Sequence, residues 1–192
     1  MIFKKFYNVS LRRNMKIYTR KGDKGMTALW DGGMTSKSDY RFVIVGEIDE
    51  LSSRIGMLCA LLENDFEYMS FLRKIQANLQ FINSHIVTVK KQASLTQIEN
   101  QDIKELEYNI DSIDNRNEPL TKFILPGVTN QDAQCHVCRT QCRKVERFMW
   151  LKKEYLNDNP NAENIFKYVN RLSDFFFVLA RFCTPEGMEC FA

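Results

Sequence analysis

The segment 168–181 constrains the fold more than any other, because it is apolar almost all round a helix. Its polar exceptions fall on one line at helical spacing: Asn170, Asp174 and Arg181. A helix of this kind is typical of the middle of a bundle or of a subunit interface. Asn159 and Pro160 form an N-cap followed by proline at the first helical position, which predicts a helix to about Phe182.

Four earlier segments repeat apolar residues at helical spacing, at about 39–63, 66–90, 96–114 and 131–156. Thr96 with Glu99 forms a capping-box pattern at the start of the third. The stretch 115–130 contains two prolines and a glycine, which indicates a loop, and no segment predicts a strand. With 192 residues and 44% hydrophobic content, the chain predicts an all-α bundle of about five helices in one domain, preceded by an irregular N-terminal loop.

The first 14 residues differ from the rest, and we expect the globular domain to cover 15–192. Seven Lys and Arg residues precede the first acid, Asp23. This leader is interpreted as a mitochondrial presequence, a disordered basic tail, or a stretch before an alternative start at Met15. The protein is expected to be intracellular, in the mitochondrial matrix if the leader is a presequence and in the cytoplasm otherwise.

Charge and cysteine content exclude several functions. The net charge of +3 gives no case for nucleic-acid binding, and the clustering of positive charge favours a local anion site. No apolar run approaches the roughly 20 residues of a membrane span, so a soluble protein is expected.

The six cysteines form no extracellular pattern and predict reduced thiols. Cys135, Cys138, Cys142 and His136 suggest a metal site, but His136 points away from the cysteines on the helical wheel, which favours core cysteines.

Arg139, Arg143 and Glu146 form one stripe along the fourth predicted helix, at about 100° per residue. The stripe lies beside small and apolar residues that predict a core-facing side. Guanidinium groups at a core edge are costly unless something pairs with them, and a polyanion is the obvious partner. A solvated basic face or a structural row of ion pairs is the alternative.

Three other features accompany this stripe. A Gly- and Lys-rich loop, from Tyr18 to Gly25 and on to Lys37, can present backbone N–H and ammonium groups to phosphates, although its spacing is not that of a Walker A loop. Asp49 is the only acid in a stripe of small residues that permits close approach of a helix or a flat ligand: Ser52, Ser53, Gly56 and Ala60. The predicted loop at 115–130 holds the apolar run 123–127.

These stretches together resemble the trimeric type of ATP:cob(I)alamin adenosyltransferase, the class that includes the human mitochondrial enzyme. Four of them occur in family order: 18–25, 46–53, 123–127 with 136–147, and 168–181. The resemblance implies a ferritin-like five-helix bundle that forms a homotrimer with active sites between subunits. It also implies transfer of the 5′-deoxyadenosyl group of ATP to Co(I) of cobalamin, giving adenosylcobalamin and triphosphate. A reductase and an adenosylcobalamin-dependent mutase are the implied protein partners.

The resemblance also implies a role for each matched residue. Catalysis is assigned to Arg139, Arg143, Glu146 and Asp49, with Asp49 orienting Arg139. ATP binding is assigned to Thr19, Arg20, Lys21, Gly22, Asp23, Lys24, Gly25, Thr27, Lys37, Arg143, Lys144, Glu146, Arg147 and Asn170. Phe123 is expected to pack where the lower axial ligand of cobalamin would bind, which leaves cobalt four-coordinate and eases its reduction. No metal site fixed by protein ligands alone is expected; Mg²⁺ would come with ATP, near Glu146.

The chain departs from the family pattern at Lys21, Val128, Lys144 and Val145. Two alternatives remain. One is a non-catalytic sensor or carrier of ATP or cobalamin with the same fold. The other is an unrelated helical scaffold with a structural Arg/Glu row, which requires Lys24, Lys37, Arg139 and Arg143 to lie far apart, whereas an enzyme requires them to converge.

Overall fold

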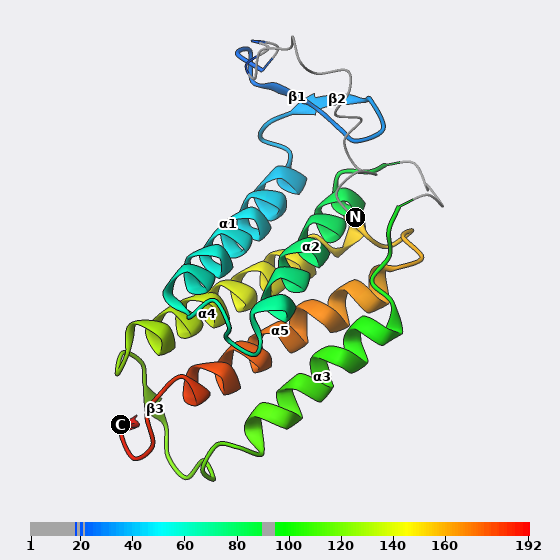
Figure 1. Cartoon of the computed structure of the whole chain (residues 1–192). Coiled ribbons are helices and arrows are strands. Elements are labelled where there is room, and N and C mark those ends of the chain that lie inside the picture. Colours follow the sequence, from blue (N-terminus) through cyan, green and yellow to red (C-terminus); the bar gives the residue numbers. More distant parts are fainter. Residues whose placement is uncertain (1–17, 19, 21, 90–94) are drawn as a thin grey trace.

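The computed structural model describes Tyr18, Arg20, 22–89 and 95–192; the predicted leader, Thr19 and Lys21 lie outside these residues. Five α-helices form a bundle (Figure 1): α1 Tyr40–Leu61, α2 Met69–Ile86, α3 Asn100–Asp114, α4 Asn130–Leu151 and α5 Ala162–Phe182. The prediction of a five-helix bundle is confirmed. None of the helices in the described part of the chain combines the length and apolarity needed to cross a membrane.

Helix α5 lies inside the bundle, as its sequence predicts. It packs against α3 and α4, while α1 packs against α2 and α4. Tyr168, Phe175 and Phe176 of α5 are almost fully buried, and Phe71 of α2 meets the Phe175 ring edge-on. The Tyr168 hydroxyl accepts a hydrogen bond from Asn78 of α2, which satisfies the polar atom that its burial takes from water.

Two predicted helix starts are wrong in detail. The capping box of α3 uses Glu99 and Asp102 rather than Thr96 and Glu99, since the Thr96 carbonyl is bound to His85 instead. Helix α5 begins after Asn161, not after Asn159, whose side chain accepts from the Asn161 backbone N–H. Tertiary hydrogen bonds therefore decided between neighbouring capping candidates.

The absence of strands was predicted wrongly. β1 Met26–Ala28 pairs with β2 Met34–Ser36 in an antiparallel hairpin, and β3 Ile124–Leu125 pairs with β4 Cys190–Phe191. The hairpin stands beyond the N-terminal end of α1, and the second pair lies at the opposite end of the bundle (Figure 1). Strands of two or three residues give too short an alternation to recognise in sequence, and the second pair joins distant segments.

Side chains of α4 fix its register against α1. Three glutamines donate to main-chain carbonyls of α1: Gln131 to Leu61 at 3.1 Å, Gln134 to Arg54 at 2.8 Å and Gln141 to Glu47 at 3.0 Å. Beside them, Cys135, Cys138 and Cys142 are 0% exposed, so the predicted core position of these thiols is confirmed. The register fixes which α4 side chains face away from α1.

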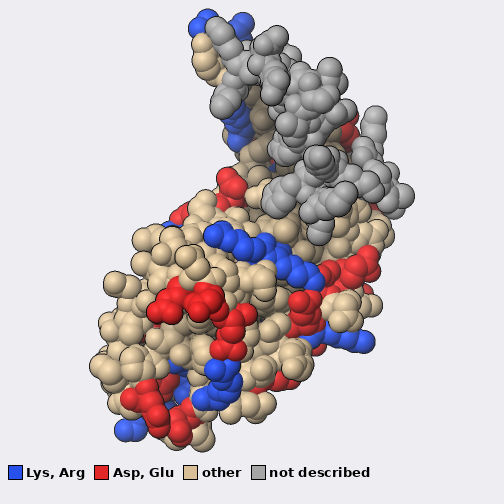
Figure 2. Space-filling model, in the orientation of Figure 1, with Lys and Arg blue, Asp and Glu red and all other residues tan. Residues whose placement is uncertain are grey.

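Charged side chains of both signs lie next to each other on the visible face of the molecule (Figure 2). Ion pairs between helices account for part of this mixing. Lys74 of α2 contacts Asp102 and Glu105 of α3 at 2.8 and 2.6 Å, and Arg171 of α5 contacts Glu107 of α3 at 3.0 Å. Of the ten arginines in the described residues, five have a carboxylate partner: Arg41, Arg54, Arg116, Arg171 and Arg181.

Candidate functional site

The Gly- and Lys-rich loop forms a compact turn ahead of the hairpin. Backbone hydrogen bonds run from Asp23 to Arg20 and from Gly25 to Gly22, and Gly25 has a φ of +76°, a conformation that favours glycine. The Lys37 ammonium lies over Gly22, where an added Cβ would stand only 3.0 Å from Nζ. The fold thus places one ammonium group directly against a tight glycine turn, where a phosphate oxygen could approach it.

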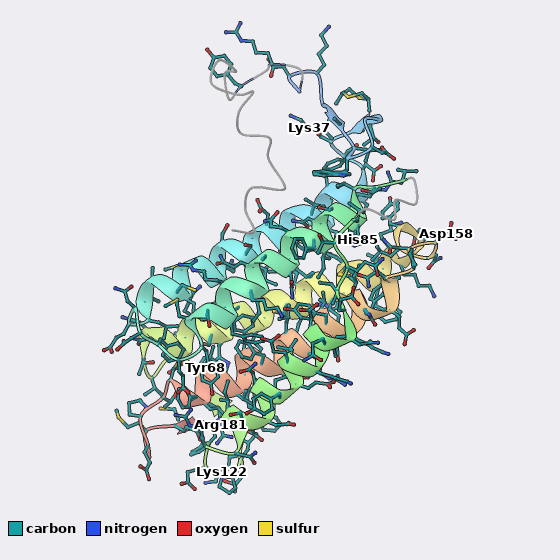
Figure 3. All side chains as sticks on the ribbon, turned by 45° about the vertical axis from the view of Figure 1, so that its right-hand side comes forward. Lys37, Tyr68, His85, Lys122, Asp158 and Arg181 are labelled. Carbon is teal, nitrogen blue, oxygen red and sulfur yellow. The ribbon has the colours of Figure 1, made fainter. Side chains whose placement is uncertain are left out.

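The hairpin is tied to the end of α2. The Trp30 N–H donates to the Val87 carbonyl at 3.1 Å, and the Val89 N–H donates to Asp31 Oδ2 at 3.2 Å. Figure 3 shows Lys37 in this projecting part of the chain, beyond the bundle. The predicted phosphate loop therefore lies at one end of the molecule.

The predicted arginine stripe lies on α4. Arg139 is half-buried and Arg143 is exposed. Burial, and next the charge of Arg143, lowers the pKa of Arg139. The Arg139 Nε donates to His136 Nδ1 at 3.1 Å. Among the described residues, neither Arg139 nor Arg143 pairs with a carboxylate, whereas five other arginines do: Arg41, Arg54, Arg116, Arg171 and Arg181.

Glu146, the acid of the stripe, is held by α5. Asn170 Nδ2 donates to Glu146 Oε1 at 2.9 Å, and Arg171 donates to Asn170 Oδ1 at 3.0 Å. Burial raises the pKa of Asp174, one turn along α5, and the charge of Glu146 adds to this effect. The structure therefore brings together Glu146 and Asn170 from the predicted set, and the second carboxylate oxygen of Glu146 has no hydrogen-bond partner among the described residues.

Lys144 and Asp49 lie away from this stripe. Lys144 pairs with Glu47 of α1 at 2.8 Å, on the side of α4 that faces α1. Asp49 is exposed on α1, and no ion pair joins it to Arg139 within the described chain. The predicted contact between Asp49 and Arg139 is therefore not made inside one subunit.

The predicted cobalamin residue stands in solvent. Phe123 is 87% exposed, and its carbonyl accepts from the Ala192 N–H at 3.0 Å beside the β3–β4 pair. A buried carboxylate fixes the turn that follows, because Asp132 accepts from the N–H groups of Gly127, Val128 and Thr129 at 2.7–2.8 Å. Gly127 adopts a φ of +111° whereas Val128 needs no such conformation, so the departure at Val128 strains nothing.

The two predicted substrate loops lie at opposite ends of the bundle. Figure 3 shows Lys37 at one end, and Lys122 and Arg181 at the other. Helix α4 runs between these ends, and its 22 residues span about 33 Å. In the described chain, Lys37 therefore lies far from the end that holds Lys122, the neighbour of Phe123, while the predicted convergence of Lys24, Lys37, Arg139 and Arg143 stays a prediction.

Two residues of this region, Asp132 and His136, have contacts that were not predicted from the sequence. Asp132 belongs to a Thr-x-x-Asp capping pattern with Thr129, which was visible in the sequence. His136 was considered only as a metal ligand, yet it is 6% exposed and contacts the stripe through Arg139. A histidine three residues before an arginine on a helix was the available signal.

Comparisons with known proteins agree with one another. The family model for cobalamin adenosyltransferase matches residues 17–183. The chain is 37% identical to corrinoid adenosyltransferase MMAB from Bos taurus over 173 residues, covering 87% of this chain and 70% of the relative. It is also 37% identical to corrinoid adenosyltransferase MMAB from Homo sapiens over 181 residues, covering 91% of this chain and 71% of that relative. A variant of the PduO-type ATP:corrinoid adenosyltransferase from Lactobacillus reuteri, solved with cobalamin and ATP, superposes with a TM-score of 0.80 at 30% identity, covering 92% of this chain and 97% of that one.

Proposed function

The chain belongs to the cobalamin adenosyltransferase family and is an ATP:corrinoid adenosyltransferase; from this premise we propose how its own residues carry out the reaction. Co(I) of the reduced corrinoid attacks C5′ of ATP, the Co–C bond forms as the C5′–O bond breaks, and triphosphate leaves with the electron pair. The nucleophile comes from the corrinoid, so the protein needs no nucleophile of its own. Its tasks are to align the substrates and to neutralise the leaving group.

One observation carries the assignment of the site: the guanidinium groups of Arg139 and Arg143 have no carboxylate partner in the described part of the chain. The charge of Arg143 acts unfavourably on the Arg139 guanidinium, and a polyanion bound by both groups would relieve this repulsion. ATP supplies several negative charges at once. A structural row of ion pairs would instead have joined these arginines to acids, as it does Arg171 and Arg181.

The proposed ATP site uses two sets of residues. The phosphates bind to the turn 19–25 and Thr27 through N–H groups, with Lys24 and Lys37 as cations. Arg143 and Arg147 of α4 bind the triphosphate from the other side, and Asn170 holds the carboxylate of Glu146. Lys144 acts indirectly, because its ion pair with Glu47 joins α4 to α1.

Glu146 is the proposed contact for Mg²⁺. One of its oxygens accepts from Asn170, and the other is available. Mg²⁺ in nucleotide sites uses one or two carboxylates together with substrate phosphates, and this donor set fits that pattern. When bound, the ion would neutralise charge on the departing triphosphate.

Phe123 is the proposed corrinoid contact. An 87% exposed phenylalanine immediately before β3 contributes little to the core, and a bound corrinoid would bury its ring. An apolar ring beneath the corrin keeps water and the lower axial ligand from cobalt. The cobalt then stays four-coordinate, which makes reduction to Co(I) easier.

We further propose a homotrimer whose active sites lie between subunits. The phosphate loop and Phe123 lie at opposite ends of one chain, yet the reacting C5′ and cobalt must meet. A second subunit supplies the missing half. Asp49, exposed and unpaired with Arg139 in its own chain, would then orient Arg139 of the neighbouring subunit. A reductase and a mutase that uses adenosylcobalamin are the proposed protein partners, and residues 1–14 remain a predicted leader.

The test follows the visible spectrum of cob(I)alamin with MgATP under anaerobic reduction. We expect conversion to the spectrum of adenosylcobalamin, and a loss of roughly a hundredfold or more in rate for Arg139→Ala. Arg73→Ala is the control, since Arg73 is exposed on α2 and its hydrogen bond goes to Gln76 on the same helix. A spectrum that shifts on binding without forming adenosylcobalamin would favour the carrier alternative.

A further inference from the structure

His136 lies between the arginine stripe and the loop of Phe123. Its side chain is 6% exposed, and its ring meets Phe177 of α5 edge-on at 6.2 Å between centroids. On one side its Nδ1 accepts from Arg139 Nε at 3.1 Å. On the other side it lines a narrow crevice with Ile124, Leu125, Val128 and Asp132. No other described side chain is hydrogen-bonded to Arg139.

The chemistry of this bond fixes the state of the imidazole. A guanidinium group has N–H donors and no acceptor, so Arg139 can only donate to His136. Nδ1 must therefore carry a lone pair, and the single ring proton is on Nε2. Only the neutral ring meets this condition, because both nitrogens of a protonated histidine are donors.

The charged groups around His136 favour the neutral ring. Burial lowers the pKa of His136, and the charge of Arg139 lowers it further, while Asp132 acts in the opposite sense. Arg181 and Glu189 of the α5 end and the C-terminal segment line the same crevice, and they are bound to each other at 2.7 Å. Phe177, the ring that α5 packs on His136, carries no charge.

We propose that His136 is a positioning residue for the adenosyl transfer, a neutral acceptor that orients the Arg139 guanidinium toward the leaving triphosphate. The inference rests on the proposed role of Arg139 and extends it to a residue that touches neither substrate. Arg139 is otherwise a long, flexible side chain that no carboxylate of the described residues holds. A fixed guanidinium loses less conformational entropy when the transition state forms.

Two substitutions separate the acceptor from the packing. His136→Phe keeps an aromatic ring against Phe177 but has no acceptor, whereas His136→Asn offers a carbonyl oxygen close to the position of Nδ1. A lost bond to a charged donor predicts a fall of roughly tenfold to a hundredfold in kcat for His136→Phe, with a smaller change in KM for ATP. His136→Asn should stay within about threefold of the unmodified protein.

A double-mutant cycle then tests whether His136 acts through Arg139. If it does, His136→Phe has no further effect on the rate in an Arg139→Ala background, because the group that it orients is gone. Additive losses would overturn the inference. Full activity of Arg139→Ala would instead refute the assignment of the site itself, so the two failures are distinguishable. Thermal unfolding of each variant excludes loss of fold as the cause.

The pH dependence provides a readout that a packing role would not change. Protonated His136 cannot accept from Arg139, so the single-turnover transfer rate of the unmodified protein should fall relative to His136→Asn as pH decreases from about 8 to 5. The ratio of the two rates removes effects of pH on ATP and cobalt. His85→Asn is the matched control, because His85 is also buried, with its pKa lowered by burial, and is bound to Thr96 and Asn159 rather than to the stripe. A constant ratio for His136→Asn, or an equal change for His85→Asn, would overturn the proposal.

Discussion

Replacing Asp132 by Asn tests whether one buried carboxylate holds in place the loop that follows Phe123, the proposed corrinoid contact. Asp132 is 2% exposed and accepts three backbone N–H groups at 2.7–2.8 Å. These donors come from Gly127, Val128 and Thr129, the turn that connects β3 to α4. An asparagine has the same shape, but one of its two terminal atoms is a donor and it carries no charge.

The magnitude follows from the individual bonds. The best orientation of the amide keeps its oxygen against Val128 and Thr129, and turns its NH₂ toward the Gly127 N–H. One charge-assisted bond is lost, worth about 1.5–3 kcal/mol, and two become neutral, each weaker by about 1 kcal/mol. Loss of negative charge at the start of α4 acts in the same direction. We expect the free energy of unfolding to fall by about 3.5–5 kcal/mol, and the Tm to fall by roughly 7–20 °C for a chain of this size.

The assay is urea unfolding followed by helical circular dichroism, together with cobalamin and ATP binding at a temperature where both proteins are folded. Asp102→Asn is the matched control, since Asp102 occupies the same capping-box position on α3. It accepts only one backbone N–H, from Glu99 at 2.9 Å, and pairs with Lys74. Its substitution should cost about 1 kcal/mol and leave cobalamin binding unchanged.

Equal destabilisation by Asp132→Asn and Asp102→Asn would refute the reasoning, because the three donors would then contribute no more than one. Binding gives a second criterion. Loss of ATP affinity with unchanged cobalamin affinity would contradict the assignment of this turn to the corrinoid side of the site.

Three further predictions concern single contacts. Gly22→Ala places a Cβ 3.0 Å from Lys37 Nζ, so it should displace the ammonium and raise KM for ATP several-fold at unchanged Tm; an unchanged KM would contradict the phosphate role of the turn. Phe123→Ala removes a side chain that is 87% exposed, so the free energy of unfolding should change by less than about 0.5 kcal/mol while the spectrum of four-coordinate cob(II)alamin is lost; its persistence would refute the role of Phe123. Burial alone raises the pKa of Glu47, but hydrogen bonds from Lys144 and Gln141 lower it, and the net pKa lies below 4.5. The ionised carboxylate therefore stabilises the fold above that pH, and this stabilisation is lost as pH falls through the lowered pKa. The stability difference between Glu47→Gln and the unmodified protein should thus shrink in acid, and a difference independent of pH would contradict this.

The helices were predictable because the helical spacing of apolar residues lies within one continuous segment for each helix and extends over many residues. The apolar segment 168–181 predicts a buried helix whatever surrounds it, and the structure confirms this for Tyr168, Phe175 and Phe176. The start of α3 was not predictable to the residue, because Thr96 and Glu99 are both acceptable caps. A hydrogen bond from His85, on another helix, decided between them.

The short strands depended on contacts that the sequence does not display. Residues 124–125 pair with 190–191 only because α5 returns the C-terminal segment to the start of α4. The buried ion pair of Arg181 with Glu189 holds that segment in place. Such pairings arise from the fold as a whole, and a pattern within four residues cannot specify them.

The candidate site was predictable in its residue types but not in its arrangement. The motifs named Arg139, Lys144 and Asp49 together, yet neighbouring α4 positions face different surroundings. Lys144 faces α1 and pairs with Glu47, while Arg139 faces away and, among the described side chains, hydrogen-bonds to His136. Which side of α4 meets α1 is set by the glutamine contacts, including that of Gln134, and these are visible only in the folded chain.

The failure of the phosphate loop to meet Phe123 within one chain could have been taken as support for a structural role of the arginine row. The pairing of charges argues otherwise. A structural row requires each buried cation to have an acid close by, and within the described residues no acid forms an ion pair with Arg139, although Asp49 is exposed. An unpaired cation and an unpaired acid on separate surfaces of one molecule are complementary across an interface between two copies. The distance between the phosphate loop and Phe123 in a single chain therefore supports a site shared between subunits. In such a site, Asp49 of one copy and His136 of the other would hold Arg139 from two sides.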